Sequence, residues 1–248
     1  MIGTMRLAGV FDGLKVRPRS RHNVQRFLSR AIDFGFRSFD TAPIYCRGIA
    51  EEALGDFSSE DLAITTKVGV NIDSTLPQLA YSYSEYWRSL EGSLTRLRRS
   101  RVSCLLLHNP AVRQVRSDDF LRFCEDVLRQ GISHRVGCSV SDSVTFRAAV
   151  ELSPNSDIMI SRQLLNSPSV LNRSRKAGQR ILVRTLFGGT FANTPARIQP
   201  SQIVNEAIST LRGALPLAQL VIAPHTLIQL TAYKDDINSA SQGGMAGL

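Results

Sequence analysis

Short apolar runs alternate with amphipathic segments along nearly the whole chain. The runs are rich in Val, Ile, Leu or Phe, which is typical of strands that are buried on both faces of a sheet. The pattern predicts eight strands, at residues 5–10, 37–42, 62–68, 103–108, 135–140, 158–165, 181–186 and 220–223.

Apolar residues recur at helical spacing in the segments between these runs. Gly35 and Gly131 follow two of the resulting helices, and Ser117 with Asp118 and Asp119 should cap the start of another. The apolar faces are Val24, Phe27, Leu28, Ala31 and Ile32; Trp87, Leu90, Leu94 and Leu97; Phe120, Cys124, Val127 and Leu128; and Ile203, Ala207, Ile208 and Leu211.

Eight strands that alternate with about eight helices over 248 residues predict an α/β chain folded as a single-domain (β/α)8 TIM barrel. We assign residues 1–240 to the barrel and residues 241–248 to a disordered C-terminal tail. An open doubly wound sheet is the alternative. It is disfavoured because no Gly-x-Gly-x-x-Gly motif follows any predicted strand.

The composition, 43% hydrophobic and 21% charged, is that of an ordinary globular protein. No apolar run approaches the roughly 20 residues of a membrane span, and the first residues do not resemble a secretory signal. Four cysteines without metal-ligand spacing favour a reduced, cytoplasmic setting, with Cys104 and Cys138 in the core. The net charge of +9 comes from scattered arginines that match no nucleic-acid-binding module, so we expect no nucleic-acid partner.

Three predicted strands end on a side chain that can bind or transfer a proton. These are Asp40, Lys67 and His108, and Tyr45 lies in the turn after the first of them. Because the carboxyl ends of barrel strands meet at one mouth, we expect the four side chains to form a proton-transfer set. Each also has a structural alternative: a helix cap or ion pair for Asp40, a loop aromatic for Tyr45, a solvated strand end for Lys67 and a turn residue for His108.

The sequence around these residues resembles the aldo-keto reductase family, and the resemblance covers essentially the whole chain. Three motifs in the right order make it specific. The matching residues are Gly35-Phe36-Arg37, Asp40-Thr41-Ala42, Tyr45, Glu51 and Leu54-Gly55; Thr66-Lys67-Val68; Leu106-Leu107-His108-Asn109-Pro110; Val136-Gly137-Cys138-Ser139; Gln163-Leu164-Leu165-Asn166; and Val183-Arg184-Thr185-Leu186-Phe187.

The resemblance implies that Tyr45 is the general acid, or the base in the oxidative direction, of a carbonyl–alcohol interconversion. A free tyrosine has a pKa near 10, and a lysine ammonium such as that of Lys67 should lower it. Asp40 would pair with the lysine and keep it charged. His108 would orient the substrate carbonyl.

The resemblance further implies a nicotinamide cofactor, NADP(H) or NAD(H). We expect no metal, because the histidines other than His108 form no ligand cluster with Asp, Glu or Cys. Cofactor-binding positions are Ser139 and Gln163 at the carboxamide, with Asn166 close by; Arg184, Thr185 and Leu186 beside the nicotinamide and pyrophosphate; Gly188 at the phosphates; and His225 and Gln229 in the adenosine-phosphate clamp.

Five positions depart from the common family pattern. Val140 stands where many members carry Asn, and Arg184 where many carry an aromatic that stacks on the nicotinamide. Cys46 replaces the common Gly after the tyrosine. His225 and Gln229 stand where NADP-preferring members often place Lys or Arg, so NAD use is included in the prediction. A bacterial, sugar-dehydrogenase-like branch of the family shares Arg and Val at the first two positions.

The sequence therefore predicts an oxidoreductase that acts on a small aldehyde, ketone or sugar. Two alternatives remain open. One is a barrel that binds a nicotinamide dinucleotide as a regulatory or structural subunit without turnover. The other is a lyase in which Lys67 forms a Schiff base with a carbonyl substrate.

Overall fold

The computed structural model describes residues 1–12, 15–57, 61–72, 78–80, 82–176 and 178–184, together with residues 209, 213, 215, 218–223, 230 and 231. The proposed tail, residues 241–248, and most of the helix predicted around Ile203 lie outside these residues. No helix in the described part of the chain combines the length and apolar character needed to cross a bilayer.

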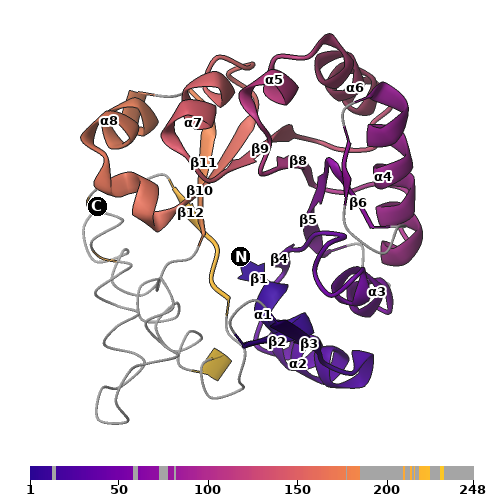
Figure 1. The fold of residues 1–248 in the computed structure, drawn as a ribbon. Helices are drawn as coiled ribbons and strands as arrows, with labels where there is room; N and C mark the ends of the chain where they lie inside the picture. The colour runs from indigo at the N-terminus through magenta and orange to yellow at the C-terminus, as the bar shows by residue number, and fades with distance from the viewer. Residues whose placement is uncertain are drawn as a thin grey trace.

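Eight parallel strands form one sheet in the order of their appearance along the chain, with two short hairpins outside it. Ile222, just beyond the last strand, forms a parallel bridge with Ile2 of the first, and the Gly3 amide donates to the Ile222 carbonyl at 2.6 Å. The sheet therefore closes into a barrel with helices around it (Figure 1), and the (β/α)8 prediction is confirmed. The strands are β1 (Ile2–Gly3), β4 (Ser38–Asp40), β5 (Ala63–Val68), β8 (Cys104–His108), β9 (Val136–Val140), β10 (Asp157–Ser161), β11 (Arg180–Arg184) and β12 (Gln219–Leu220).

The helices begin at capping residues that the sequence supplies. Ser117 Oγ accepts from the Phe120 amide, as predicted, and Ser82 forms a capping box with Glu85. The helices are α1 (Met5–Ala8), α2 (Arg21–Asp33), α3 (Ile49–Gly55), α4 (Tyr83–Leu97), α5 (Val112–Val115), α6 (Asp118–Arg129), α7 (Ser143–Ala149) and α8 (Pro168–Lys176), with a 3₁₀ turn η1 (Arg162–Asn166). The hairpins are β2 (Gly9–Asp12) with β3 (Lys15–Pro18), and β6 (Val70–Asn71) with β7 (Gln78–Leu79).

The first predicted strand is wrong. Residues 5–10 begin with α1, a short run of good helix formers, and end in the β2–β3 hairpin, while the barrel strand is Ile2–Gly3. The sixth strand stops at Ser161, and the rest of its apolar run forms η1. Leu128 is 42% exposed because α6 buries Phe120, Phe123 and Val127 instead.

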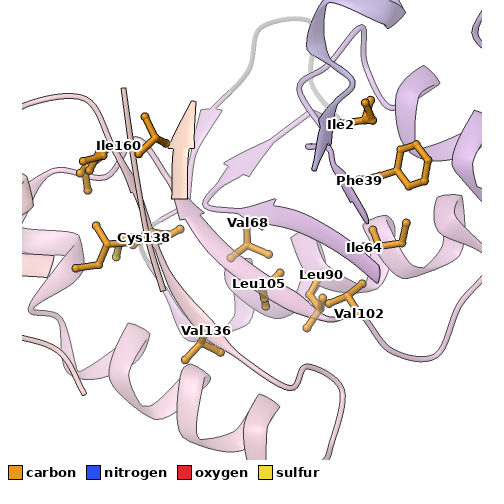
Figure 2. Close-up of a cluster of buried hydrophobic side chains, with 14 of the residues drawn as sticks. Ile2, Phe39, Ile64, Val68, Leu90, Val102, Leu105, Val136, Cys138 and Ile160 are labelled. Atoms are coloured by element: carbon orange, nitrogen blue, oxygen red, sulfur yellow. The ribbon is translucent and has the colours of Figure 1, made fainter. Parts of the chain in front are cut away.

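Alternating positions on each strand face opposite sides of the barrel wall. One large cluster fills the space between strands and helices, and Figure 2 shows part of it, with Ile64 and Leu105 near Leu90 of α4. A second buried cluster comes from intervening positions on the same strands and fills the barrel interior: Cys104, Leu106, Met159, Leu182 and Val221. The core placement predicted for Cys104 is confirmed, and so is that of Cys138, which belongs to the outer cluster.

Asp157 anchors the amino-terminal end of the barrel. It is fully buried at the start of β10, where its carboxylate accepts from Arg135 Nε at 2.5 Å, Arg180 Nε at 3.0 Å and Cys104 Sγ at 3.2 Å. A buried carboxylate is stable only when its oxygens are paired in this way. The charged cluster therefore joins β8, β9, β10 and β11 at the end opposite the predicted site.

Replacing Asp157 with Ala should lower the free energy of unfolding by about 3 kcal/mol, because three donors lose a buried anionic partner. Glu151→Ala is the matched control. Its carboxylate pairs with Arg116 while both side chains are more than half exposed, so its loss should change stability by about 0.5 kcal/mol or less. Urea unfolding measures both, and equal effects would contradict the structural role of Asp157.

Candidate active site

The four predicted catalytic residues come together at the carboxyl ends of neighbouring strands. Asp40 is the last residue of β4, Lys67 is next to last in β5, and His108 ends β8. Tyr45 lies in the turn between β4 and α3, where its amide donates to the Ala42 carbonyl at 3.1 Å. Because β4, β5 and β8 are adjacent in the sheet, these side chains share one sector of the barrel mouth.

The ammonium group of Lys67 is the centre of this set. Its Nζ atom donates to Asp40 Oδ1 at 2.6 Å, to the Thr41 carbonyl at 2.8 Å and to the Tyr45 hydroxyl at 3.1 Å. The Lys67 side chain is 1% exposed and that of Asp40 5%. All three donors of the ammonium are therefore used, which fixes its direction toward the phenol.

His108 lies beside Tyr45 without bonding to it. The ring centroids are 6.0 Å apart and the planes are nearly perpendicular, at 89°. The Nδ1 atom of His108 is buried and has no hydrogen-bond partner within the described residues. Burial, together with the positive charges of Lys67 and Arg184, lowers the pKa of His108 to about 3. The imidazole is therefore neutral at physiological pH, with one ring nitrogen protonated and the other able to accept a hydrogen bond.

Burial is the largest single influence on the pKa of each of the other three groups, but it decides the net direction only for Asp40 and Tyr45. It raises the pKa of Asp40 against the opposing effect of Lys67. It would lower the pKa of Lys67, but Asp40 and Tyr45 outweigh it, and the pKa of Lys67 is raised. Burial also raises the pKa of Tyr45 above its usual value, although Lys67 lowers it. The prediction of a lowered tyrosine pKa is thus wrong in net direction, because sequence reasoning took no account of desolvation.

The turn that follows Tyr45 has an unusual backbone. Cys46, Arg47 and Gly48 adopt positive φ angles of 50°, 55° and 90° in succession. Only glycine adopts this left-handed region without cost, so the common Gly at the Cys46 position of the family has a structural reason. The guanidinium of Arg47 donates to the Ile72 carbonyl at 3.0 Å and ties the turn to the segment after β6.

A buried acid connects this turn to the strand that carries Lys67. Glu51 of α3 is fully buried, and its carboxylate accepts from Thr66 Oγ1 at 2.6 Å and from Arg96 Nε at 2.7 Å. Thr66 precedes Lys67 in β5, and Arg96 belongs to α4. Sequence reasoning included Glu51 in the signature but assigned it no contact, because its partners lie 15 and 45 residues away.

Several predicted cofactor positions surround the same mouth. Ser139 is buried in β9 and is the register partner of His108. Gln163 and Asn166 are exposed on η1, and neither side chain has a hydrogen-bond partner within the described residues. These polar side chains directly after β10 and the His108 Nδ1 atom at the end of β8, all unpartnered in the described part of the chain, fit a ligand with several hydrogen-bonding groups, such as a nicotinamide carboxamide. Thr185, Leu186, Gly188, His225 and Gln229 lie outside the described residues.

Arg184 ends β11 and reaches across the mouth. Its Nη2 atom donates to Ser141 Oγ at 2.9 Å and lies 3.5 Å from the Val140 carbonyl and from Asn109 Oδ1. Ser141 in turn donates to Asn109 at 2.7 Å. The sequence did not reveal Ser141 or Asn109 as partners of Arg184. Their only signal is that each is a polar residue directly after a strand.

No group of three or more His, Cys, Asp or Glu side chains within the described residues is placed to hold a metal ion. The family model of the aldo/keto reductases matches residues 1–184, which is most of the chain and includes the four predicted catalytic positions. The chain belongs to the aldo/keto reductase family.

Solved aldo-keto reductases share the fold at low sequence identity. The holo form of AKR11C1 from Bacillus halodurans matches with a TM-score of 0.74 and 15% identity, over 95% of this chain and 85% of that one. The glycerol dehydrogenase AKR11B4 from Gluconobacter oxydans gives 0.70 and 17%, over 98% and 88%. An aldo-keto reductase from Klebsiella pneumoniae in complex with NADPH gives 0.66 and 17%, over 97% and 88%.

Replacing Cys46 with Gly should raise the free energy of unfolding of this aldo/keto reductase by about 0.5–1 kcal/mol. The gain arises because glycine adopts the left-handed conformation without the steric cost that a Cβ atom imposes. The greater conformational entropy of glycine in the unfolded chain offsets part of this gain. Cys46→Ala is the control, because it keeps the Cβ atom and should give no gain. Denaturant unfolding of the three proteins tests this, and an equal effect of Ala and Gly would exclude backbone strain as the cause.

Proposed function

We propose that this aldo/keto reductase interconverts a small aldehyde or ketone with the corresponding alcohol, and that Tyr45 is its general acid and base. The observation that carries the proposal is the 3.1 Å hydrogen bond from Lys67 Nζ to the Tyr45 hydroxyl. It couples the phenol to an ammonium that Asp40 keeps charged. A proton donor whose conjugate base is stabilised in place is what carbonyl reduction requires.

In the reductive direction Tyr45 gives its proton to the substrate oxygen, and the phenolate that remains is stabilised by Lys67. When bound, a nicotinamide dinucleotide supplies the hydride for the carbonyl carbon, since no protein side chain can do so. Neutral His108 orients the carbonyl through a ring nitrogen that can donate to its oxygen. In the oxidative direction the Tyr45 phenolate accepts the alcohol proton.

Residues of this chain offer a cradle for that cofactor. Ser139, Gln163 and Asn166 supply hydrogen-bonding groups beside the catalytic set, and Arg184 reaches over the mouth. By family resemblance the remaining contacts come from Thr185, Leu186 and Gly188, and from His225 and Gln229 in the adenosine-phosphate clamp. Because the last two are not fixed positive charges, the proposal includes NAD(H) as well as NADP(H).

A sugar or polyol is included among the substrates, because the similar structures include a glycerol dehydrogenase. The Schiff-base lyase is disfavoured by the raised pKa of Lys67, since burial, which would lower it, is outweighed by Asp40 and Tyr45. A protonated amine cannot attack a carbonyl. The alternative of a regulatory subunit would be supported if the protein bound the dinucleotide tightly but did not oxidise the reduced cofactor with any aldehyde of a broad panel.

Tyr45→Phe should lower kcat for aldehyde reduction by about 10²–10⁴-fold, because the proton donor is lost while the fold and the cofactor contacts remain. Steady-state kinetics measure the loss. Parallel fluorescence titrations of both proteins with NADPH and with NADH should give nearly unchanged affinities. Full turnover in the variant would remove Tyr45 from the acid role.

Lys67→Met should shift the onset of alcohol oxidation to higher pH. Without the ammonium the phenolate is less stable, so the pKa of Tyr45 rises and more alkaline solution is needed to form the base. The pH profile of kcat/KM in the oxidative direction measures this shift. The double variant Asp40→Asn/Lys67→Met controls for the unpaired buried carboxylate that the single change leaves, and an unshifted profile in both would exclude the tuning role.

A further inference from the structure

The charges around Tyr45 do not balance. Four strands carry ionisable groups at their carboxyl ends, at the mouth where the phenol lies: β4 with Asp40, β5 with Lys67, β8 with His108 and β11 with Arg184. Asp40, Lys67 and Arg184 act on the phenol electrostatically, and the centroid of the His108 ring lies 6.0 Å from that of Tyr45. Asp40 and Lys67 form an ion pair at 2.6 Å, so their effects on the phenol oppose each other. His108 is neutral. Arg184 is therefore the one remaining full charge among these groups.

The partners of Arg184 do not neutralise it. Its hydrogen bonds within the described residues reach only uncharged acceptors, namely Ser141 Oγ, Asn109 Oδ1 and the Val140 carbonyl, and among those residues it forms no salt bridge. Its Nε atom is buried and unpartnered among those residues. A partly buried guanidinium without a carboxylate partner keeps a net positive charge that acts on neighbouring groups.

The contacts also hold the guanidinium at the level of the catalytic set. Arg184 ends its strand, and its Nη2 atom reaches residues that directly follow β8 and β9. Asn109 is adjacent to His108 and adopts a positive φ of 47°, which Asn tolerates better than most residues. The Ser141–Asn109 hydrogen bond at 2.7 Å fixes both acceptors. These contacts hold the guanidinium over the carboxyl ends of β8 and β9.

We propose that Arg184, braced by Ser141 and Asn109, is a positioning residue that acts through Tyr45, as the uncompensated cation that favours the phenolate over the phenol. This inference rests on the proposed function, because it deepens the role of Tyr45. It assigns to Arg184 a role in proton transfer, besides the cofactor contact that the family resemblance implies. The positive charge of Arg184 also acts on Asp40 and His108, favouring the carboxylate and disfavouring the imidazolium.

Direct titration of the phenol tests the proposal without turnover. The ionisation of Tyr45 is read from the difference in tyrosinate absorbance between each protein and the same protein carrying Tyr45→Phe. Arg184→Gln should raise the apparent pKa of Tyr45 by about one unit, and Arg184→Lys should restore most of the shift because the charge is kept. Arg129→Gln removes an exposed arginine from the end of α6 and is the charge-matched control, expected to leave the titration unchanged.

Asn109→Asp provides a second variant that keeps Arg184 in place. A carboxylate about 3.5 Å from the guanidinium neutralises it and adds a negative charge near the phenol, so it should also raise the apparent pKa of Tyr45. A purely structural role would change thermal stability but leave the titration where it is. An unshifted phenol titration in folded Arg184→Gln, or in Asn109→Asp, would overturn the proposal.

Kinetics separate this proposal from the proposed function. If the enzyme oxidises alcohols, the alkaline limb of its kcat/KM profile should move by the same amount as the phenol titration. If Arg184→Gln raises the apparent pKa of Tyr45 but the protein turns over no carbonyl substrate, the role of Arg184 is supported and the oxidoreductase assignment is contradicted. If the enzyme turns over a carbonyl substrate but Arg184→Gln leaves the Tyr45 titration unchanged, the oxidoreductase assignment is supported and the role of Arg184 is contradicted.

Discussion

The hydrogen bonds of one buried ammonium group determine the arrangement of the site. A lysine that is 1% exposed is stable as a cation only if its donors are satisfied and its charge is paired. Asp40, the Thr41 carbonyl and Tyr45 meet this condition. Asp40 ends β4, Thr41 follows it directly and Tyr45 lies in the turn beyond, so this condition fixes the path of the chain between β4 and α3.

That path is held from outside the barrel as well. Glu51 accepts from Thr66, which precedes the lysine on its strand, and from Arg96 of α4. The three left-handed residues that end with Gly48 allow the chain to turn from the phenol into α3 within this short distance. Conformational strain next to a reactive side chain is common where surrounding contacts fix the backbone, and here the buried Glu51 supplies those contacts.

The charged groups that stabilise the barrel and the groups of the candidate active site lie at opposite ends of the strands. At the amino-terminal ends of the strands, Asp157 joins Arg135 and Arg180 in a charged cluster beneath the interior layer. At the carboxyl ends, inward positions carry Lys67, His108, Ser139 and Arg184. In between, apolar residues such as Met159 fill the interior. Desolvation in this packed mouth raises the pKa of Tyr45 and lowers that of His108, so the free site holds a protonated phenol and a neutral imidazole.

The sequence by itself determined the number and order of the strands, the family and the four ionisable residues that meet at the barrel mouth, because strand periodicity and motif spacing are local properties. It misplaced the first strand, since the apolar pattern of residues 5–10 does not distinguish a short helix from a strand. The tertiary structure alone decided which side chains are buried, which charges remain unpaired and how Ser141 and Asn109 hold Arg184. These properties depend on distances between residues far apart in the chain, and the net direction of the tyrosine pKa follows from them.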